Sequence, residues 1–362
     1  MVAEMTPFDR AIASLNDDPV DQLTAYPIAC GVLRRLLPDH PTYREWASDP
    51  KICASAFIEG FNRYKFPFTV TLLDLSVMAA DLGAHVRMDT ENTPFVDKHI
   101  VETPEDYEKL EVPDITKGRS NVLIETNRIV GKELKGKSAI AAFLEGPLLV
   151  LSQSVGAEKL LMDMYTDPAP VHKALEVTTQ YAVDITNALG ETGVDAMCWD
   201  YLWANYSVLG DKEYHEFEAD KYAKATNDAT RDNGLVLGVH SCADLPHLDT
   251  QINEFGSAMY SMAYYPLIPG SLSASEVIDK GYADNCLIAG NIDPQLFIRG
   301  TPEKVTEITK GLCQEVKTAL CRRGLNSRYC IASGCEVPPS LETNLDNISA
   351  VMDTVNRYGR FD

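Results

Sequence analysis

Several features that place proteins in membranes or outside the cell are missing from this sequence. No apolar run approaches the ~20 residues that a helix needs to cross a bilayer. The first residues contain no basic segment followed by an apolar one, so no secretory signal is visible. Nine cysteines are an odd number in a chain of 362 residues, which argues against a disulfide framework. We therefore expect a cytoplasmic protein with reduced cysteines, a composition that also suits an anaerobe.

Positive charge is scarce as well. The chain has 32 Lys and Arg residues against 53 Asp and Glu residues, and its formal net charge is −21. A surface of this sign repels nucleic acids and anionic membranes, so neither is expected as a partner. A polyanionic substrate is disfavoured for the same reason, unless a local basic pocket overrides the field.

Linkers rich in Pro, Gly or Ser, short repeats and low-complexity tracts are also missing. We therefore expect one domain over 1–362, with 1–22 as an N-terminal extension. What the chain does contain is a series of short β-type runs separated by helical stretches. Several runs are apolar throughout, as in strands buried on both faces of a parallel sheet. The candidate strands are 23–31, 68–76, 137–146, 194–202, 235–241, 257–265, 286–293 and 328–335.

The stretches between these runs carry helix start signals. Thr301 is a predicted N-cap ahead of Pro302, and Asp167 occupies the same position before another helix. Eight strands alternating with helices predict a (β/α)8 TIM barrel, with a doubly wound open sheet as the alternative. Longer, partly helical excursions are expected at 32–67 and 77–136.

Polar residues lie at the ends of nearly all the predicted strands. In a (β/α)8 barrel the functional groups lie at the C-terminal ends of the strands, which open onto one rim. We therefore expect these side chains to gather around a single site. They are Asp74, Glu145, Asp200, Tyr201, His240, Cys242, Tyr264, Tyr265, Asn291, Asp293 and Cys335.

The stretch GLVLGVHSCADLPHL, residues 234–248, is an apolar run that ends on an imidazole and a thiol. Residues i and i+2 of a strand point to the same side, so His240 and Cys242 point together. Cys335 ends the last predicted strand and reaches the same rim. One nitrogen and two sulfurs favour a Zn²⁺ site with a fourth position open.

Spacing alone leaves two interpretations of these residues open. Cysteine next to histidine is common in ordinary cores, so His240 and Cys242 are also readable as packing residues. Cys330 competes with Cys335 for the third ligand position, but it lies about 16 Å upstream along an extended strand. Cys335 is preferred because it stands at the strand end.

Six segments of the chain resemble the uroporphyrinogen decarboxylase superfamily, and more closely its zinc-dependent corrinoid methyltransferase branch. They include VHSCAD, AGNIDPQLFIRGTPEKVTE and ASGCEVPPSLETNLDNISAVMD, and the likeness runs from about Asp49 to Met352. The resemblance implies a (β/α)8 barrel and a zinc ion bound by His240, Cys242 and Cys335. It also implies a corrinoid (cobalamin) carried by a partner protein.

The decarboxylase branch of this superfamily uses no metal and holds a polycarboxylated tetrapyrrole with an arginine-rich N-terminal segment. Arg34 and Arg35 are present here, but the decarboxylase signature around them is absent. Asp74 matches an aspartate in a region that the decarboxylases use in catalysis. Capping a helix start is the alternative role for this carboxylate.

The remaining strand-end residues are assigned by position. Asp74 and Asp200 are the candidate catalytic residues. Some relatives place an acidic residue after the sixth strand, near the zinc, but the loop SMAYYPLIPG has none. The fourth ligand therefore stays open between water, a substrate heteroatom and a tyrosine. Candidates for binding or orienting the substrate are Glu145, Tyr201, Tyr264, Tyr265 and Asn291.

The resemblance predicts a zinc-dependent methyltransferase that moves a methyl group between a small methylated substrate and the cobalt of a corrinoid protein. A methoxylated aromatic that undergoes O-demethylation is the leading substrate. The alternatives are a methylcobamide:coenzyme M methyltransferase with a thiol acceptor, a uroporphyrinogen-type decarboxylase, and a non-catalytic zinc-binding barrel subunit. A homodimer stays open as the assembly.

Overall fold

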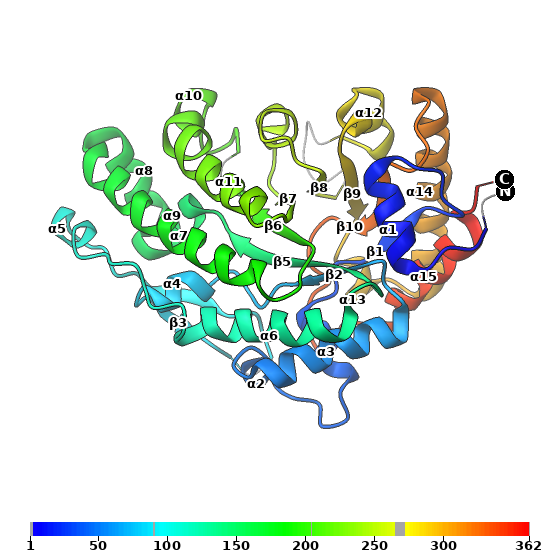
Figure 1. The fold of residues 1–362 in the computed structure, drawn as a ribbon, viewed down its shortest axis with the longest axis horizontal. Coiled ribbons are helices and arrows are strands. Elements are labelled where there is room, and N and C mark those ends of the chain that lie inside the picture. The colour runs from blue at the N-terminus through cyan, green and yellow to red at the C-terminus, as the bar shows by residue number, and fades with distance from the viewer. Residues whose placement is uncertain (1–2, 90, 204, 265–271, 362) are drawn as a thin grey trace.

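The core of the structure is a sheet of eight parallel strands. The computed structural model describes residues 3–89, 91–203, 205–264 and 272–361 (Figure 1). The strands follow the order β1-β10-β9-β8-β7-β6-β5-β2, which runs around a (β/α)8 barrel in chain order and excludes a doubly wound sheet. The predicted barrel is confirmed. Its strands are β1 (Thr24–Tyr26), β2 (Phe68–Thr71), β5 (Ala139–Glu145), β6 (Ala196–Asp200), β7 (Val236–Ser241), β8 (Met259–Met262), β9 (Leu287–Ile292) and β10 (Tyr329–Ser333).

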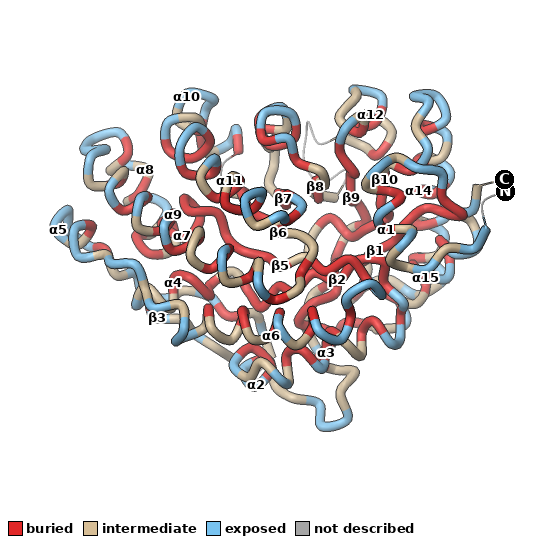
Figure 2. Tube along the Cα trace, viewed as in Figure 1, coloured by how far each residue is buried: buried red, intermediate tan, exposed pale blue. Residues whose placement is uncertain are grey.

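Long helices cover the outside of the sheet, and the residues between the two layers are buried (Figure 2). Thr301 Oγ1 accepts a hydrogen bond from the backbone N–H of Lys304 at 3.3 Å, which confirms the predicted N-cap. No helix of the described residues is both long enough and apolar enough to cross a membrane. The larger helices are α3 (Pro50–Tyr64), α6 (Gly118–Leu134), α7 (Pro147–Val155), α8 (Ala157–Thr166), α9 (Pro168–Gly190), α11 (Lys224–Asp232), α14 (Pro302–Arg323) and α15 (Leu345–Tyr358).

Shorter elements connect the barrel units. A π-helical turn, η2 (His215–Ala223), leads into α11 without a break, and a second one, η3 (Asp249–Glu254), precedes β8. The others are η1 (Gly31–Leu36), α2 (Tyr43–Trp46), α4 (Val77–Asp81), α5 (Pro104–Tyr107), α10 (Asp211–Tyr214), α12 (Ala274–Asp279), η4 (Tyr282–Asp284) and α13 (Leu296–Arg299).

The two predicted excursions are largely helical, with one addition. The first contains most of η1 together with α2 and α3, and the second contains α4, α5 and α6. The second also contains an antiparallel pair, β3 (His85–Arg87) and β4 (Phe95–Lys98), which the sequence did not predict. Residues of this hairpin are exposed or half-buried, so the hairpin lacks the apolar signal by which the barrel strands were found.

Side chains close the barrel where β1 meets β2. These two strands end the hydrogen-bonded order of the described sheet, with no ladder between them. The backbone N–H of Val70 donates to Tyr26 Oη at 3.1 Å, and the Cys30 thiol donates to the Val70 carbonyl at 3.4 Å. Two strands that share no ladder are therefore still tied together.

Helix α1 (Pro7–Asn16) covers the N-terminal end of the barrel, where it contacts β1, β2 and β5. The Arg10 guanidinium pairs with the Asp21 carboxylate at 2.7 Å, and both side chains are nearly buried. Ile12 and Leu15 of α1 line the cavity inside the barrel. The expected N-terminal extension therefore forms the floor of the barrel.

Candidate metal centre at the strand ends

One imidazole and two thiols meet at the C-terminal end of the barrel. His240 is the fifth residue of β7, Cys242 follows the end of that strand, and Cys335 follows β10. One ligand atom from each of the three lies within 4.8 Å of the other two. The structure thus brings together the three residues predicted as metal ligands, across 93 residues of sequence between the two thiols.

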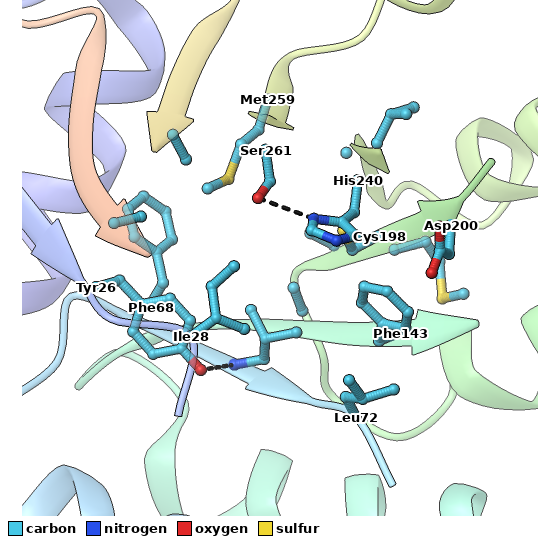
Figure 3. A pocket seen from close by; sticks show the side chains of 18 of the residues that line it. Tyr26, Ile28, Phe68, Leu72, Phe143, Cys198, Asp200, His240, Met259 and Ser261 are labelled. Carbon is cyan, nitrogen blue, oxygen red and sulfur yellow. Dashed lines mark hydrogen bonds between the residues drawn. The ribbon is translucent and has the colours of Figure 1, made fainter. Parts of the chain in front are cut away.

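The imidazole of His240 is held in a fixed orientation. Its Nδ1 lies 2.9 Å from Ser261 Oγ, and Ser261 is its register partner on the neighbouring strand β8. The ring is buried beside Phe143, with 5.9 Å between ring centroids. Figure 3 shows this hydrogen bond at the side of the cavity. Because Nδ1 is engaged by a hydroxyl, Nε2 is the nitrogen left to bind a metal.

The two thiols form a close pair. Their sulfur atoms are 3.6 Å apart. The pKa of the Cys335 thiol is lowered, first because Cys242 hydrogen-bonds to its thiolate and then because His240 lies beside it. A thiolate, rather than a thiol, is the form that binds a metal.

This donor set fits zinc. Ligands at about 2.0 to 2.3 Å from a tetrahedral Zn²⁺ lie roughly 3.3 to 3.8 Å from one another. The two sulfurs are already 3.6 Å apart, and all three ligand atoms lie within 4.8 Å of one another. One imidazole and two sulfurs are borderline-soft donors, which suit zinc better than calcium or magnesium.

Two buried carboxyl groups lie in register with His240 on the two preceding strands of the barrel. Glu145 of β5 is paired with Asp200 of β6, which is in turn paired with His240. Burial raises the pKa of Asp200 to about 7 and that of Glu145 to about 8. Asp200 lines the cavity and accepts a hydrogen bond from the backbone N–H of Leu202 at 3.0 Å. Glu145 Oε1 has no hydrogen-bond partner in the described part of the chain.

Asp74 is fixed by an arginine. Its carboxylate pairs with the Arg119 guanidinium and also accepts hydrogen bonds from the backbone and side chain of Ser76. The Asp74 side chain is buried and lines the cavity. Ser76 is the residue before α4, so the carboxylate supports a helix start and faces the cavity at the same time.

The other predicted substrate-binding residues lie apart from this cluster. The structure does not bring Tyr201 to the cavity: its hydroxyl contacts Thr226 and Asn227 of α11, because neighbouring residues of a strand face opposite sides. Asn291 is the second-last residue of β9, and Tyr264 follows β8, but neither is among the described residues that line the cavity. Tyr265 lies outside the described residues.

A cavity of about 1230 Å³, with its open mouth included, continues from the metal centre along the barrel axis (Figure 3). Glu336 joins Asp74 and Asp200 at its upper end. It accepts a hydrogen bond from the backbone N–H of Gly31 at 2.8 Å, and burial raises its pKa to about 8. The described lining residues include no lysine or arginine. The site is therefore acidic and thiol-rich above, and apolar below.

Comparisons with known proteins identify the family. A family model described as uroporphyrinogen decarboxylase (URO-D) matches residues 6–358. The chain belongs to the uroporphyrinogen decarboxylase family. A solved structure of this fold, a methyltransferase from Methanosarcina mazei, superposes with a TM-score of 0.81 over 98% of this chain and 99% of that one, at 20% identity.

Among the proteins similar to this chain are both methyltransferases and decarboxylases. Methylcobamide:CoM methyltransferase MtbA of Methanosarcina acetivorans is 24% identical over 324 residues, which are 85% of this chain and 89% of that protein. Uroporphyrinogen decarboxylase of Hydrogenovibrio crunogenus is 24% identical over 351 residues, which are 92% and 93% of the two chains. The predicted resemblance to the superfamily and its methyltransferase branch is confirmed.

Sequence reasoning missed three polar residues that shape the site of this family member. Glu336 directly follows Cys335 and was visible in the motif GCEVPP. Ser261 was visible as the inward-facing partner of His240 on the next strand. Arg119 had no local signal, because it belongs to the start of helix α6 and reaches Asp74 only through the fold.

Proposed function

We propose that this chain is a methyltransferase that moves a methyl group between a small methylated substrate and the cobalt of a corrinoid held by a partner protein. The observation that carries the proposal is the convergence of His240, Cys242 and Cys335 at the mouth of the barrel. When bound by these residues, zinc would act as a Lewis acid that activates a thiol or an ether oxygen. The names of the methyltransferase relatives support the corrinoid as the methyl carrier.

The chain's own residues bind and orient the reacting group. His240 Nε2 and the two sulfurs would hold the metal, and Ser261 keeps the imidazole in position. Asp200 faces the cavity beside His240, so it is the proposed residue that exchanges a proton with the substrate heteroatom. Asp74 is locked by Arg119 and serves as a positioning residue for the upper wall.

The leading substrate is a methoxylated aromatic compound that undergoes O-demethylation. Aromatic and aliphatic side chains line the cavity along the barrel axis, including Tyr26, Phe68, Leu72 and Phe143 (Figure 3). Such walls match an aryl ring.

The second candidate is methyl transfer to a thiol such as coenzyme M, which the names of the relatives favour. The donor set suits a thiol acceptor equally well. However, coenzyme M carries a sulfonate, and the described lining offers it no cationic side chain. For this reason the neutral ether ranks first.

Metal content tests the site, and a methyl-transfer screen tests the function. The purified protein is expected to contain about one zinc per chain, and Cys335→Ala is expected to lose it while the circular dichroism spectrum and Tm stay close to those of the native chain. Cys330→Ala is the matched control, since it removes a buried thiol of the same strand and leaves the ligands intact.

Methylated compounds are then incubated with the protein and a reduced corrinoid protein, and methylation of cobalt is followed by absorbance. Methyl transfer that requires Cys335 supports the enzyme. Stoichiometric zinc without transfer from any methyl ether or thioether favours the non-catalytic subunit, and conversion of uroporphyrinogen by metal-free protein favours the decarboxylase.

A further inference from the structure

The interior of this barrel is hollow where other barrels are packed. In a typical (β/α)8 barrel the inward-facing side chains are bulky Val, Ile and Leu residues that fill the axis in layers. Here many of the positions that line the axis carry almost no side chain. They are Ala139 and Ala141 of β5, Ala196 of β6, Gly238 of β7, Ala289 of β9 and Ala332 of β10.

The hollow extends over the whole length of the strands. Lining residues include the first positions of several strands, such as Phe68, Ala139 and Val236, and the last ones at the metal centre. At the floor, Ile12 and Leu15 of α1 close the axis. A chamber therefore runs from the metal centre down to helix α1, and we refer to it as the axial chamber.

The axial chamber differs in chemistry from the rim above it. Its walls are apolar, and the acidic groups Asp74, Asp200 and Glu336 lie at the upper end. Asp195, at the lower end, is occupied by a hydrogen bond from the backbone N–H of Ile140 at 2.9 Å. A charged group entering the chamber would lose its hydration without gaining a counter-ion, whereas an apolar group gains by leaving water.

We propose that the axial chamber binds the uncharged, apolar part of the methyl donor, and that the small residues of the strands set how long this part can be. The substrate class is therefore an aryl or alkyl methyl ether with an extended apolar tail. The assignment of the reacting methyl group rests on the proposed function, but binding of the tail does not depend on methyl transfer.

Two of the small residues are suited to testing this proposal. Ala141 faces the axis between Val70 and Ala196, and Ala289 faces it between Ser261 and Cys330. A leucine at either position would extend into the open chamber and shorten it. Ala169 is exposed in the first turn of α9, so Ala169→Leu is a control with the same change of side chain.

The experiment is a binding series on the zinc-loaded full-length protein without corrinoid, measured by isothermal titration calorimetry. The ligands are 4-methyl-, 4-ethyl- and 4-propylanisole, together with 4-methoxybenzoate. We expect affinity to rise about fourfold for each added methylene. The benzoate is expected to bind at least tenfold more weakly than 4-methylanisole, because its carboxylate would lie in the apolar chamber, where it loses hydration without gaining a counter-ion.

In Ala141→Leu, the affinity for 4-propylanisole is expected to fall about tenfold, with zinc content and Tm retained and with Ala169→Leu unchanged. If Ala141→Leu does not fold, Ala289→Leu gives the same test from another strand. Affinity that does not depend on tail length, or that both leucine variants leave unchanged, overturns the axial chamber even when methyl transfer is observed. Length-dependent binding without methyl transfer instead overturns the proposed function and leaves the chamber standing.

Discussion

At the level of single residues, the orientation of His240 depends on one hydroxyl. Ser261 Oγ is the hydrogen-bond partner of Nδ1, and this bond presents Nε2 to the thiols. Removing such a partner of a metal-binding histidine typically costs ten- to a hundredfold in metal affinity. We expect Ser261→Ala to weaken zinc binding by about this factor, measured by competition with a chromophoric chelator.

Ser257→Ala provides the comparison for this variant. Ser257 is also buried and lies just before β8, but its hydroxyl donates to the Gln251 carbonyl, away from the metal centre. Its loss is expected to lower Tm while zinc affinity stays unchanged. Equal zinc affinity in both variants would contradict the orienting role of Ser261.

Glu145 gives the protein a pH-dependent stability. Burial raises its pKa to about 8, against about 4.3 for an ordinary glutamate, while Asp74 and Asp200 add to the shift and Arg119 opposes it. At a pH between these two pKa values, the folded state therefore keeps a proton on Glu145 that the unfolded state has lost. The stability that comes from this proton is complete below about pH 4 and is lost as the pH rises to about 8.

Glu145→Gln is expected to abolish this dependence. Relative to the native chain, the variant should gain roughly 1.4 kcal/mol per pH unit between about pH 5 and pH 8. Urea unfolding at a series of pH values measures the difference. Parallel pH curves for the two proteins would show that Glu145 is ionised in the folded state.

The placement of individual site residues was predictable where strand alternation decides it. The i, i+2 relation placed His240 and Cys242 together, and the structure bears this out. The same rule turns Tyr201 away once Asp200 faces inward, so the assignment of Tyr201 to the site conflicted with a signal already present in the sequence. The contact of Arg119 with Asp74 could not be predicted from the sequence, because it spans 45 residues and depends on how α6 packs.

At the level of elements, Gly334 allows the chain after β10 to pass close to the segment after β8 and so to place Cys335 at the metal centre. A Cβ atom on Gly334 would lie 2.1 Å from the backbone nitrogen of Tyr264, and backbone cannot move aside as a flexible side chain can. Gly334→Ala should therefore push the end of β10 away from the segment after β8. We expect weaker zinc binding and a lower Tm, measured by metal analysis and thermal unfolding.

Gly311→Ala is the matched control for this substitution. Gly311 lies within α14, and a Cβ atom there would meet no other atom within 4 Å. Alanine in a helix interior is favoured over glycine, so this variant should be slightly more stable and keep its zinc. Normal zinc content in Gly334→Ala would contradict the close contact with Tyr264.

Helices and strands were predicted from the sequence where their residues form a clear apolar pattern, and missed where they do not. All eight barrel strands were found because their runs are largely apolar, and the structure shortens each of them at one or both ends. The β3–β4 hairpin was missed because its residues are exposed or half-buried. The π-helical turn η2 was also missed, since it continues into α11 and shares its helical composition.

At the level of the whole molecule, the fold class followed from the alternation of strands and helices, but the hollow axis did not. Ala141 and Ala289 belong to continuously apolar runs. Such a run predicts a buried strand, but it does not indicate which of its residues face the barrel axis. Only the assembled barrel shows that these residues face inward together. The proposed determinant of substrate specificity is therefore a property of the fold that no local motif carries.

The two arginines near the N-terminus, Arg34 and Arg35, donate hydrogen bonds to other parts of the chain. Arg34 is fully buried and donates to backbone carbonyls at 2.7 and 3.1 Å and to the Glu91 carboxylate at 2.8 Å. Arg35 donates to two carbonyls in the segment after β10. Both guanidinium groups therefore already donate to the protein itself, in a molecule whose net charge of −21 opposes a polycarboxylate.

We therefore expect no decarboxylation of uroporphyrinogen by either zinc-loaded or metal-free protein. The measurement is chromatography of the oxidised porphyrins after anaerobic incubation, with an authentic uroporphyrinogen decarboxylase as the positive control. Because Arg34 is bound internally, Arg34→Ala is expected to lower Tm by several degrees, since it leaves buried acceptors unpaired. Porphyrinogen turnover that Arg34→Ala abolishes without a loss of Tm would mean that this guanidinium is free to bind substrate, and would place the chain on the decarboxylase branch.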